Sequence, residues 1–145
     1  MSEFDDLEKK LAAKKEWDAS EPERIRKSNA KKKERLEEVI QDTDLIARLD
    51  SIVGWMNTKT GSSFSSQNYI EYNSFGSERY YSLEYTIFER VFFFKKKFFE
   101  ISVHETNVYL HYKGSLQQFD SIEEFFDKFK YKLVHNINTY SRFKI

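Results

Sequence analysis

Residues 80–112 of this 145-residue chain read YYSLEYTIFERVFFFKKKFFEISVHETNVYLHY. Apolar and polar side chains alternate along most of this stretch, and a period of two is typical of β-strands with one buried face. The pattern separates into three strands whose apolar stripes hold Tyr81, Leu83, Tyr85 and Ile87, then Phe99, Ile101 and Val103, then Val108, Leu110 and Tyr112. We expect turns near residues 95–97 and 106–107, and a short edge strand at 116–119. The stretch therefore predicts an antiparallel β-meander of three or four strands.

Apolar residues at steps of three and four predict one helix on each side of this meander. The first apolar stripe runs from Leu36 to Met56, and the second runs from Ile122 to Tyr140. We expect residues 61–78, between the first helix and the meander, to form a loop with one short strand. The order predicts an α+β fold, in which an N-terminal helical arm precedes a three- to four-stranded antiparallel β-meander packed against a C-terminal amphipathic helix.

The first 42 residues form a charged segment with few apolar side chains. Only three of the chain's 25 aromatic residues lie in its first 60 positions. A helix through residues 25–36 would be solvated on nearly all sides, and isolated helices of that kind are marginally stable in water. We therefore divide the chain into a charged, partly disordered helical arm at residues 1–42 and a compact α+β domain at residues 43–145. The pattern leaves open whether residues 21–58 form one helix or two.

The composition is that of a protein without membrane-spanning segments or disulfides. The longest apolar run has four residues, whereas a helix that spans a bilayer needs about 20. The chain has no cysteine, and its acidic start is unlike a signal peptide. We therefore expect a cytoplasmic protein with no membrane partner. The net charge of zero, from 24 basic and 24 acidic residues, argues against a generic nucleic-acid binder, which usually carries a basic excess.

The sequence contains no recognisable catalytic motif. Its four glycines do not form a phosphate-binding loop, and it has neither a nucleophile elbow nor a cysteine-based site. His104 and His111 are expected on one face of a hairpin, close to Glu100, but their spacing is not diagnostic of a metal site. We expect a protein that is not an enzyme and that has no catalytic residue, no cofactor and no metal.

The lysine-rich segment and the outward face of the meander are the candidate binding surfaces. Residues 91–101 place three lysines between two aromatic blocks. Such a hairpin tip could contact a protein, a nucleic acid or a lipid, and lysines there also protect an apolar β-segment from aggregation. Aromatic residues with the parity opposite to the core, such as Tyr80 and His104, would form an exposed patch of the kind found at protein interfaces. The candidate partner-binding residues are Phe92, Phe94, Lys95, Lys96, Lys97, Phe98, Tyr109 and His111.

Two hypotheses of function follow from these surfaces. The first is a non-enzymatic protein-binding factor, a small accessory or inhibitor protein that occludes or adapts a partner protein. Its composition suits a phage or mobile-element product, and a coiled-coil homodimer through helix 36–56 is one expected arrangement. The alternative is a nucleic-acid-binding module or small regulator that uses the basic clusters 24–35 and 95–97. Its candidate residues in the first cluster are Arg24, Arg26, Lys27, Lys31, Lys32, Lys33 and Arg35.

Overall fold

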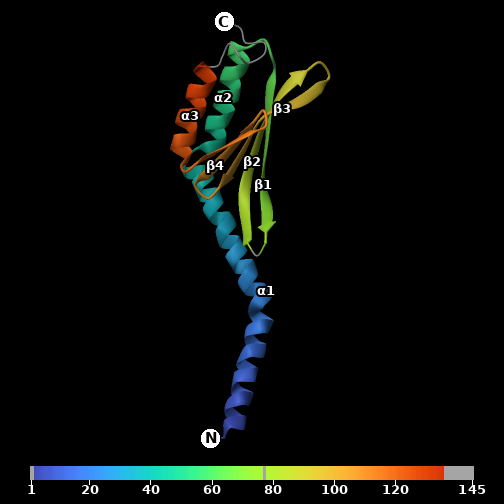
Figure 1. The fold of residues 1–145 in the computed structure, drawn as a ribbon, viewed down its shortest axis with the longest axis vertical. Coiled ribbons are helices and arrows are strands. Elements are labelled where there is room, and N and C mark those ends of the chain that lie inside the picture. Colours follow the sequence, from blue (N-terminus) through green and yellow to red (C-terminus); the bar gives the residue numbers. More distant parts are fainter. Residues whose placement is uncertain (1, 77, 136–145) are drawn as a thin grey trace.

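The computed structural model of the chain describes residues 2–76 and 78–135, and it confirms the predicted α+β fold. A long N-terminal helix leads into a body of helices and antiparallel strands, and its first half extends away from that body (Figure 1). The elements are α1 (Glu3–Asp42), α2 (Leu45–Lys59), β1 (Phe64–Phe75), β2 (Glu78–Val91), β3 (Phe94–His104), β4 (Asn107–Tyr112), β5 (Ser115–Phe119) and α3 (Ile122–His135).

The five described strands form one antiparallel sheet in the order β1-β2-β3-β4-β5, which is one strand more than we predicted. The additional strand is β1, in a segment that we expected to be mostly loop. It pairs with β2 along its whole length, from Phe64 opposite Glu89 to Phe75 opposite Glu78. Its serine, asparagine and glutamine residues obscure the strand pattern, because an edge strand can present polar side chains to solvent on one face. The short strand expected near residue 116 is present as β5.

The core lies between one face of the sheet and the helices, and α2 and α3 lie side by side over it (Figure 1). The predicted inward stripes of β2, β3 and β4 are buried except for Tyr81 and Tyr112, which are half-buried, and the apolar stripes of α2 and α3 also face the core. Phe99 of the sheet meets Phe129 of α3 edge to face, with ring centroids 5.1 Å apart. Arg48 of α2 donates two hydrogen bonds to the Glu123 carboxylate of α3, at 2.7 and 3.1 Å, which ties the two helices together.

Residues 21–58 belong to two helices, and the break between them lies at Thr43 and Asp44. Asp44 adopts a left-handed conformation with φ of 50°, which ends the first helix and redirects the chain. Leu36 of α1 is only 2% exposed, and Val39 and Ile40 pack against the core. The end of α1 is therefore part of the body, and the division expected after residue 42 does not follow the packing.

The homodimer expected through helix 36–56 loses its basis in this arrangement. Its apolar side chains, including Leu45, Leu49 and Met56, are fully buried against the sheet of the same chain. A second copy has no access to that stripe. On the C-terminal helix, the predicted apolar stripe is described as far as Leu133, and the residues predicted to extend it, Ile137 and Tyr140, lie outside the described residues.

Candidate functional site

The face of the sheet opposite the core carries two complete rows of side chains across its five strands. We call this surface the open face. Strand pairing places the members of each row next to one another, and none of them is buried. One row holds Tyr69, Glu84, Ser102, Tyr109 and Gln118, and the other holds Gln67, Thr86, Glu100, His111 and Leu116.

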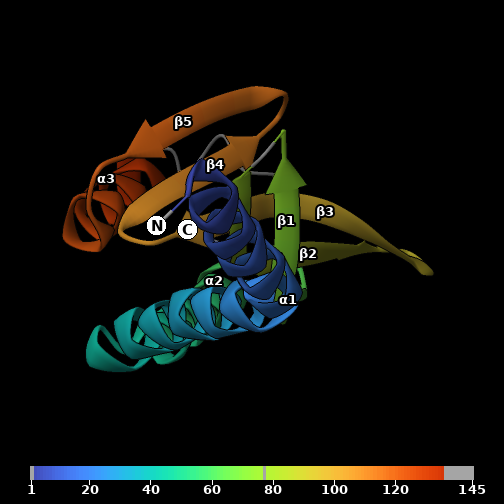
Figure 2. The same ribbon diagram turned by 90° about the horizontal axis from the view of Figure 1, so that it is seen from below.

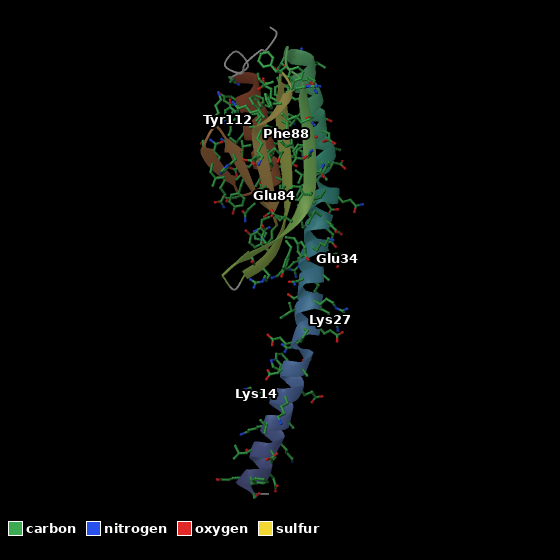
Figure 3. The ribbon with its side chains drawn as sticks, turned by 90° about the vertical axis from the view of Figure 1, so that its right-hand side faces the viewer. Lys14, Lys27, Glu34, Glu84, Phe88 and Tyr112 are labelled. Carbon is green, nitrogen blue, oxygen red and sulfur yellow. The ribbon has the colours of Figure 1, made fainter. Side chains whose placement is uncertain are left out.

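A hydrogen-bonded carboxylate lies near the middle of the open face (Figure 3). Glu84 Oε1 accepts hydrogen bonds from the hydroxyls of Ser82 and Ser102, each at 2.8 Å. The Ser82 hydroxyl in turn accepts one from Asn73 Nδ2 at 2.8 Å. Because three strands contribute to this chain of bonds, the carboxylate is held in one position before any ligand arrives, which lowers the entropy lost on binding.

Ion pairs and ring contacts surround this carboxylate. Glu100 lies 3.2 Å from Lys97 Nζ and 3.8 Å from His111 Nδ1. The rings of Tyr80 and His104 are in contact, with centroids 4.3 Å apart. A hollow of about 470 Å³ runs across these groups. Its lining is Asn73, Tyr80, Ser82, Glu84, Glu100, Ser102, His104, Tyr109, His111 and Leu116.

The side chains of this hollow are of the kinds that bind a ligand through hydrogen bonds and ring stacking. Its carboxylates and hydroxyls accept hydrogen bonds, and its tyrosine and histidine rings offer flat surfaces for stacking.

Across residues 2–76 and 78–135, no group of three or more histidine and acidic side chains is arranged to hold a metal ion. Within the same residues, no helix has the length and apolar character needed to cross a membrane.

A second exposed surface lies at the tip of the β2–β3 hairpin, which projects beyond the rest of the sheet (Figure 1). Val91 pairs with Phe94, so that Phe92 and Phe93 form the turn. Phe92, Phe93 and Phe94 are 80%, 93% and 73% exposed. Residues 95–97 are part of β3, and our expectation of a lysine turn is therefore wrong. The long inward stripe of β2 fixes the strand register, and it moves the turn onto the phenylalanines.

Phe98 belongs to the core side of the sheet and not to the open face. Ile87 pairs with Phe99 and Phe88 pairs with Lys97, so that the strand register shifts by one residue at Phe98, in a β-bulge. The extra residue reverses the alternation, as bulges do. The Phe98 ring lies 5.2 Å from that of Phe64 and 4.7 Å from that of Phe99. Phe98 therefore packs the base of the β2–β3 hairpin against the core.

The structure divides the predicted partner-binding residues into two groups. Tyr109 and His111 lie on the open face, and Phe92, Phe94 and residues 95–97 belong to the hairpin end. The contact of Lys97 with Glu100 links the two. Sequence reasoning missed the role of Glu84 and its two serines. The period of two does place them on the outward face, but it does not reveal which residues are opposite one another.

The basic residues of 24–35 lie on more than one side of α1: Arg24, Lys27, Lys31 and Arg35 follow at steps of three and four along one side, and Arg26, Lys32 and Lys33 lie on others. Arg24 lies over the Trp17 ring at 3.3 Å, and Glu23 pairs with Arg26 and Lys27 at 3.6 and 3.7 Å. Lys32 donates a 2.6 Å hydrogen bond to the Arg79 carbonyl. Lys27 and Glu34 are exposed, and both are labelled along α1 in Figure 3. Lys31, Lys33 and Arg35 are exposed as well.

The chain was compared with protein-family models, with curated proteins and with solved structures, and none of the three comparisons gives a match.

Proposed function

We propose that this chain is a non-enzymatic factor that binds a partner protein through the open face of its sheet. The observation that carries this proposal is the pair of complete side-chain rows that no described helix covers. Antiparallel sheets often keep one face in water, with charged side chains scattered along it. Here the face holds a fixed carboxylate, a hollow of about 470 Å³ and several aromatic rings. That combination favours recognition of a ligand.

The groups on the open face favour a partner segment rich in hydrogen-bond donors. Glu84 and Glu100 accept hydrogen bonds, so that lysine or arginine side chains are the natural complement. Tyr69, which is 58% exposed, is next to Glu84 in its row, and Tyr109 lies on the other side of Glu84, beyond Ser102. Tyrosine rings in this arrangement attract a cation placed over them. We therefore propose a basic or amide-rich segment as the bound part of the partner.

The phenylalanine tip supplies a second contact in this proposal. Three adjacent aromatic rings, each more than two-thirds exposed, expose apolar surface to water in the free protein. A partner pocket that enclosed one ring would gain about 25 cal/mol for each Å² removed from water. Because the tip projects beyond the sheet, it can enter a concave surface while the open face contacts a flatter one.

Occlusion or adaptation of the partner is the mechanism we propose. A rigid sheet that covers a partner's surface blocks other ligands without any chemical step. This mechanism fits a small inhibitor or accessory protein that acts in the cytoplasm, as phage and mobile-element products often do. The proposal needs no cofactor, no metal and no membrane.

The test compares two matched variants in affinity capture followed by direct binding measurement. The face variant combines Tyr69→Ala with Glu100→Lys, and the control combines Tyr131→Ala with Asp127→Lys on the exposed side of α3. We expect a protein captured by the wild type to bind the control equally and the face variant at least about tenfold more weakly. Equal affinity for the face variant would refute the proposal.

Nucleic-acid binding is the second proposal, and the hairpin end is the observation that favours it. Arg90 pairs with Lys95 in the strand register, close to Lys96 and Lys97 and to the exposed rings. Phosphate contacts release counterions, so that binding falls steeply between about 50 and 200 mM salt. A fluorescent pool of single- and double-stranded nucleic acid, titrated at both salt concentrations, tests it. Binding that collapses at the higher salt and is lost with Lys95→Glu and Lys96→Glu would support this second function.

A further inference from the structure

The arm of α1 carries its charges in four consecutive blocks of alternating sign. Residues 3–8 hold four acids and no base, and residues 9–15 hold four bases and no acid. Residues 16–23 again hold four acids and no base. Residues 24–35 hold seven bases and one acid. The order along the helix is therefore acidic, basic, acidic, basic.

An exposed stripe of apolar side chains, interrupted by Lys14 and Asp18, lies along one side of the same arm. Phe4, Leu7 and Leu11 follow at steps of three and four, and they are 69%, 64% and 46% exposed. Ile25, four helical turns further on, is on the same side and is 49% exposed. The stripe continues to Leu36, where it enters the core. The side of the helix that packs on the body thus extends along the arm without any cover in the described structure.

A groove of about 480 Å³ begins where this stripe reaches the sheet. It lies between α1, β2 and the β3–β4 turn, and Ile25 and Asn29 form part of its apolar and polar wall. Lys32, Arg35 and Arg79 line it against one acid, Glu105. The groove is therefore a mostly basic site, and an acidic helix end with an apolar side chain has the complementary charge and surface.

We infer that two copies of this chain pair through antiparallel α1 arms, with the acidic start of each arm at the basic groove of the other. In an antiparallel pair, each charged block faces a block of opposite sign, because the order acidic, basic, acidic, basic becomes its own complement when it is reversed. In a parallel pair each block would face its own sign. Charge at the flanks of paired helices sets partner choice and orientation, and here it selects the antiparallel arrangement.

The apolar stripe provides the contact between the two helices. Antiparallel pairing about a twofold axis near residue 16, at the border of the second and third charge blocks, places Phe4 and Leu7 of one copy beside Ile25 and Asn29 of the other. The interface is the same on both subunits, as expected of a twofold dimer. It closes on itself, so that both acidic ends and both grooves are used.

Alternating charge blocks also stabilise a solitary helix through pairs one turn apart, such as Lys10 with Asp6 at 3.0 Å and Lys27 with Glu23 at 3.7 Å. Those pairs account for the charges of a solvated arm. They do not account for Phe4, Leu7 and Leu11 on the side that leads into the groove. A solitary arm makes the chain a monomer, and this outcome separates the two explanations.

The first experiment exchanges charges between the two ends of the arm. One variant carries Glu3→Lys, Asp5→Lys, Asp6→Lys and Glu8→Lys, and the other carries Lys27→Glu, Lys31→Glu, Lys32→Glu and Arg35→Glu. Light scattering at low salt should give the wild type twice the 17.5 kDa of one chain, and each variant alone should have the mass of one chain. An equimolar mixture should recover the double mass, because both ends then attract. A wild type that stays at 17.5 kDa, or a mixture that does not associate, overturns the inference.

The second experiment tests the orientation, and it uses the absence of cysteine from the chain. Near the twofold axis, an Asp18→Cys variant should form a disulfide-linked dimer under mild oxidation. An Asp6→Cys variant should not, because antiparallel arms hold the two sulfurs roughly 30 Å apart along the helices at 1.5 Å per residue. Equal cross-linking of both variants would indicate a parallel pair and would overturn the antiparallel arrangement.

Discussion

Removal of residues 2–22 is expected to leave the body folded and equally stable. All these side chains are exposed, and the hydrogen bonds that connect α1 to the sheet come later, from Asn29 to Tyr72 and from Lys32 to the Arg79 carbonyl. The truncation therefore uncovers little apolar surface of the body. Changes at surfaces that make no packed contact alter the free energy of unfolding by about 0.5 kcal/mol or less.

Leu36→Ala provides the scale for this prediction, because it alters the same helix at the point where the helix enters the core. Leu36 is 2% exposed, and replacement of a core leucine by alanine lowers the free energy of unfolding by about 2–5 kcal/mol. With a urea dependence of about 1–3 kcal/mol per molar, the midpoint should fall by roughly 1–2 M. The truncation should shift it by a small fraction of that amount.

The assay is urea unfolding followed by fluorescence and circular dichroism at low protein concentration. The buffer contains about 1 M salt, which screens charges beyond about 3 Å and so suppresses pairing of the arms. We expect the truncated chain to lose helical signal and to keep its midpoint. A loss of midpoint comparable to that of Leu36→Ala would show that the arm contributes to the core, and it would refute the reasoning.

Three further predictions concern single side chains. Arg48→Ala should lower the unfolding midpoint in urea more than Glu123→Ala does, because it also removes a guanidinium 3.8 Å from an aromatic ring, a contact worth about 1 kcal/mol. Tyr85→Phe should cost about 1 kcal/mol at pH 7, since it removes the 2.6 Å hydrogen bond to Asp50. Burial, and then that hydrogen bond, raises the pKa of Tyr85, so the folded chain keeps a proton that the unfolded chain releases above about pH 10. The free energy of unfolding of the wild type should therefore fall above that pH. In urea titrations at pH 9–11, the difference in free energy of unfolding between the wild type and Tyr85→Phe should become smaller. Phe92→Gly should raise the thermal midpoint. The φ of 56° at Phe92 costs a residue with a side chain about 1 kcal/mol, and glycine removes that cost.

The sequence predicted the elements whose burial follows one simple period. The stripes of β2, β3 and β4 have a period of two and are buried on one face, and the stripe of α3 has the helical period. Strand β1 was predicted only as one short strand within a loop, because its outward residues are small and polar and its inward residues are few. Its formation depends on the long exposed edge of β2, which no local pattern in residues 61–78 reveals.

The candidate site was predicted in part, for a related reason. Alternation assigns a residue to a face, so that Tyr109 and His111 were placed on the correct side of the sheet. Neighbours across strands depend on the register, and the bulge beside Ile87 changes it by one residue. Phe98 therefore moved to the core, and the turn moved to Phe92. The bonds from Ser82 and Ser102 to Glu84 exist only in the observed register.

The two proposed surfaces meet at one end, and their arrangement has a consequence for binding. The groove lies along α1 and shares Tyr80 and His104 with the hollow of the open face, whereas the two complete side-chain rows lie outside the groove. In the end-on view of Figure 2, the cyan part of α1 lies beside α2 and away from β5. Antiparallel arms would leave the side-chain rows of both open faces available and place the two bodies at opposite ends of a paired helix roughly 40 Å long. A dimer of this form would hold two partner molecules at once, or two copies of a site on one partner. The second contact would then form within a complex that already exists, which raises the overall affinity without any new interaction at the open face.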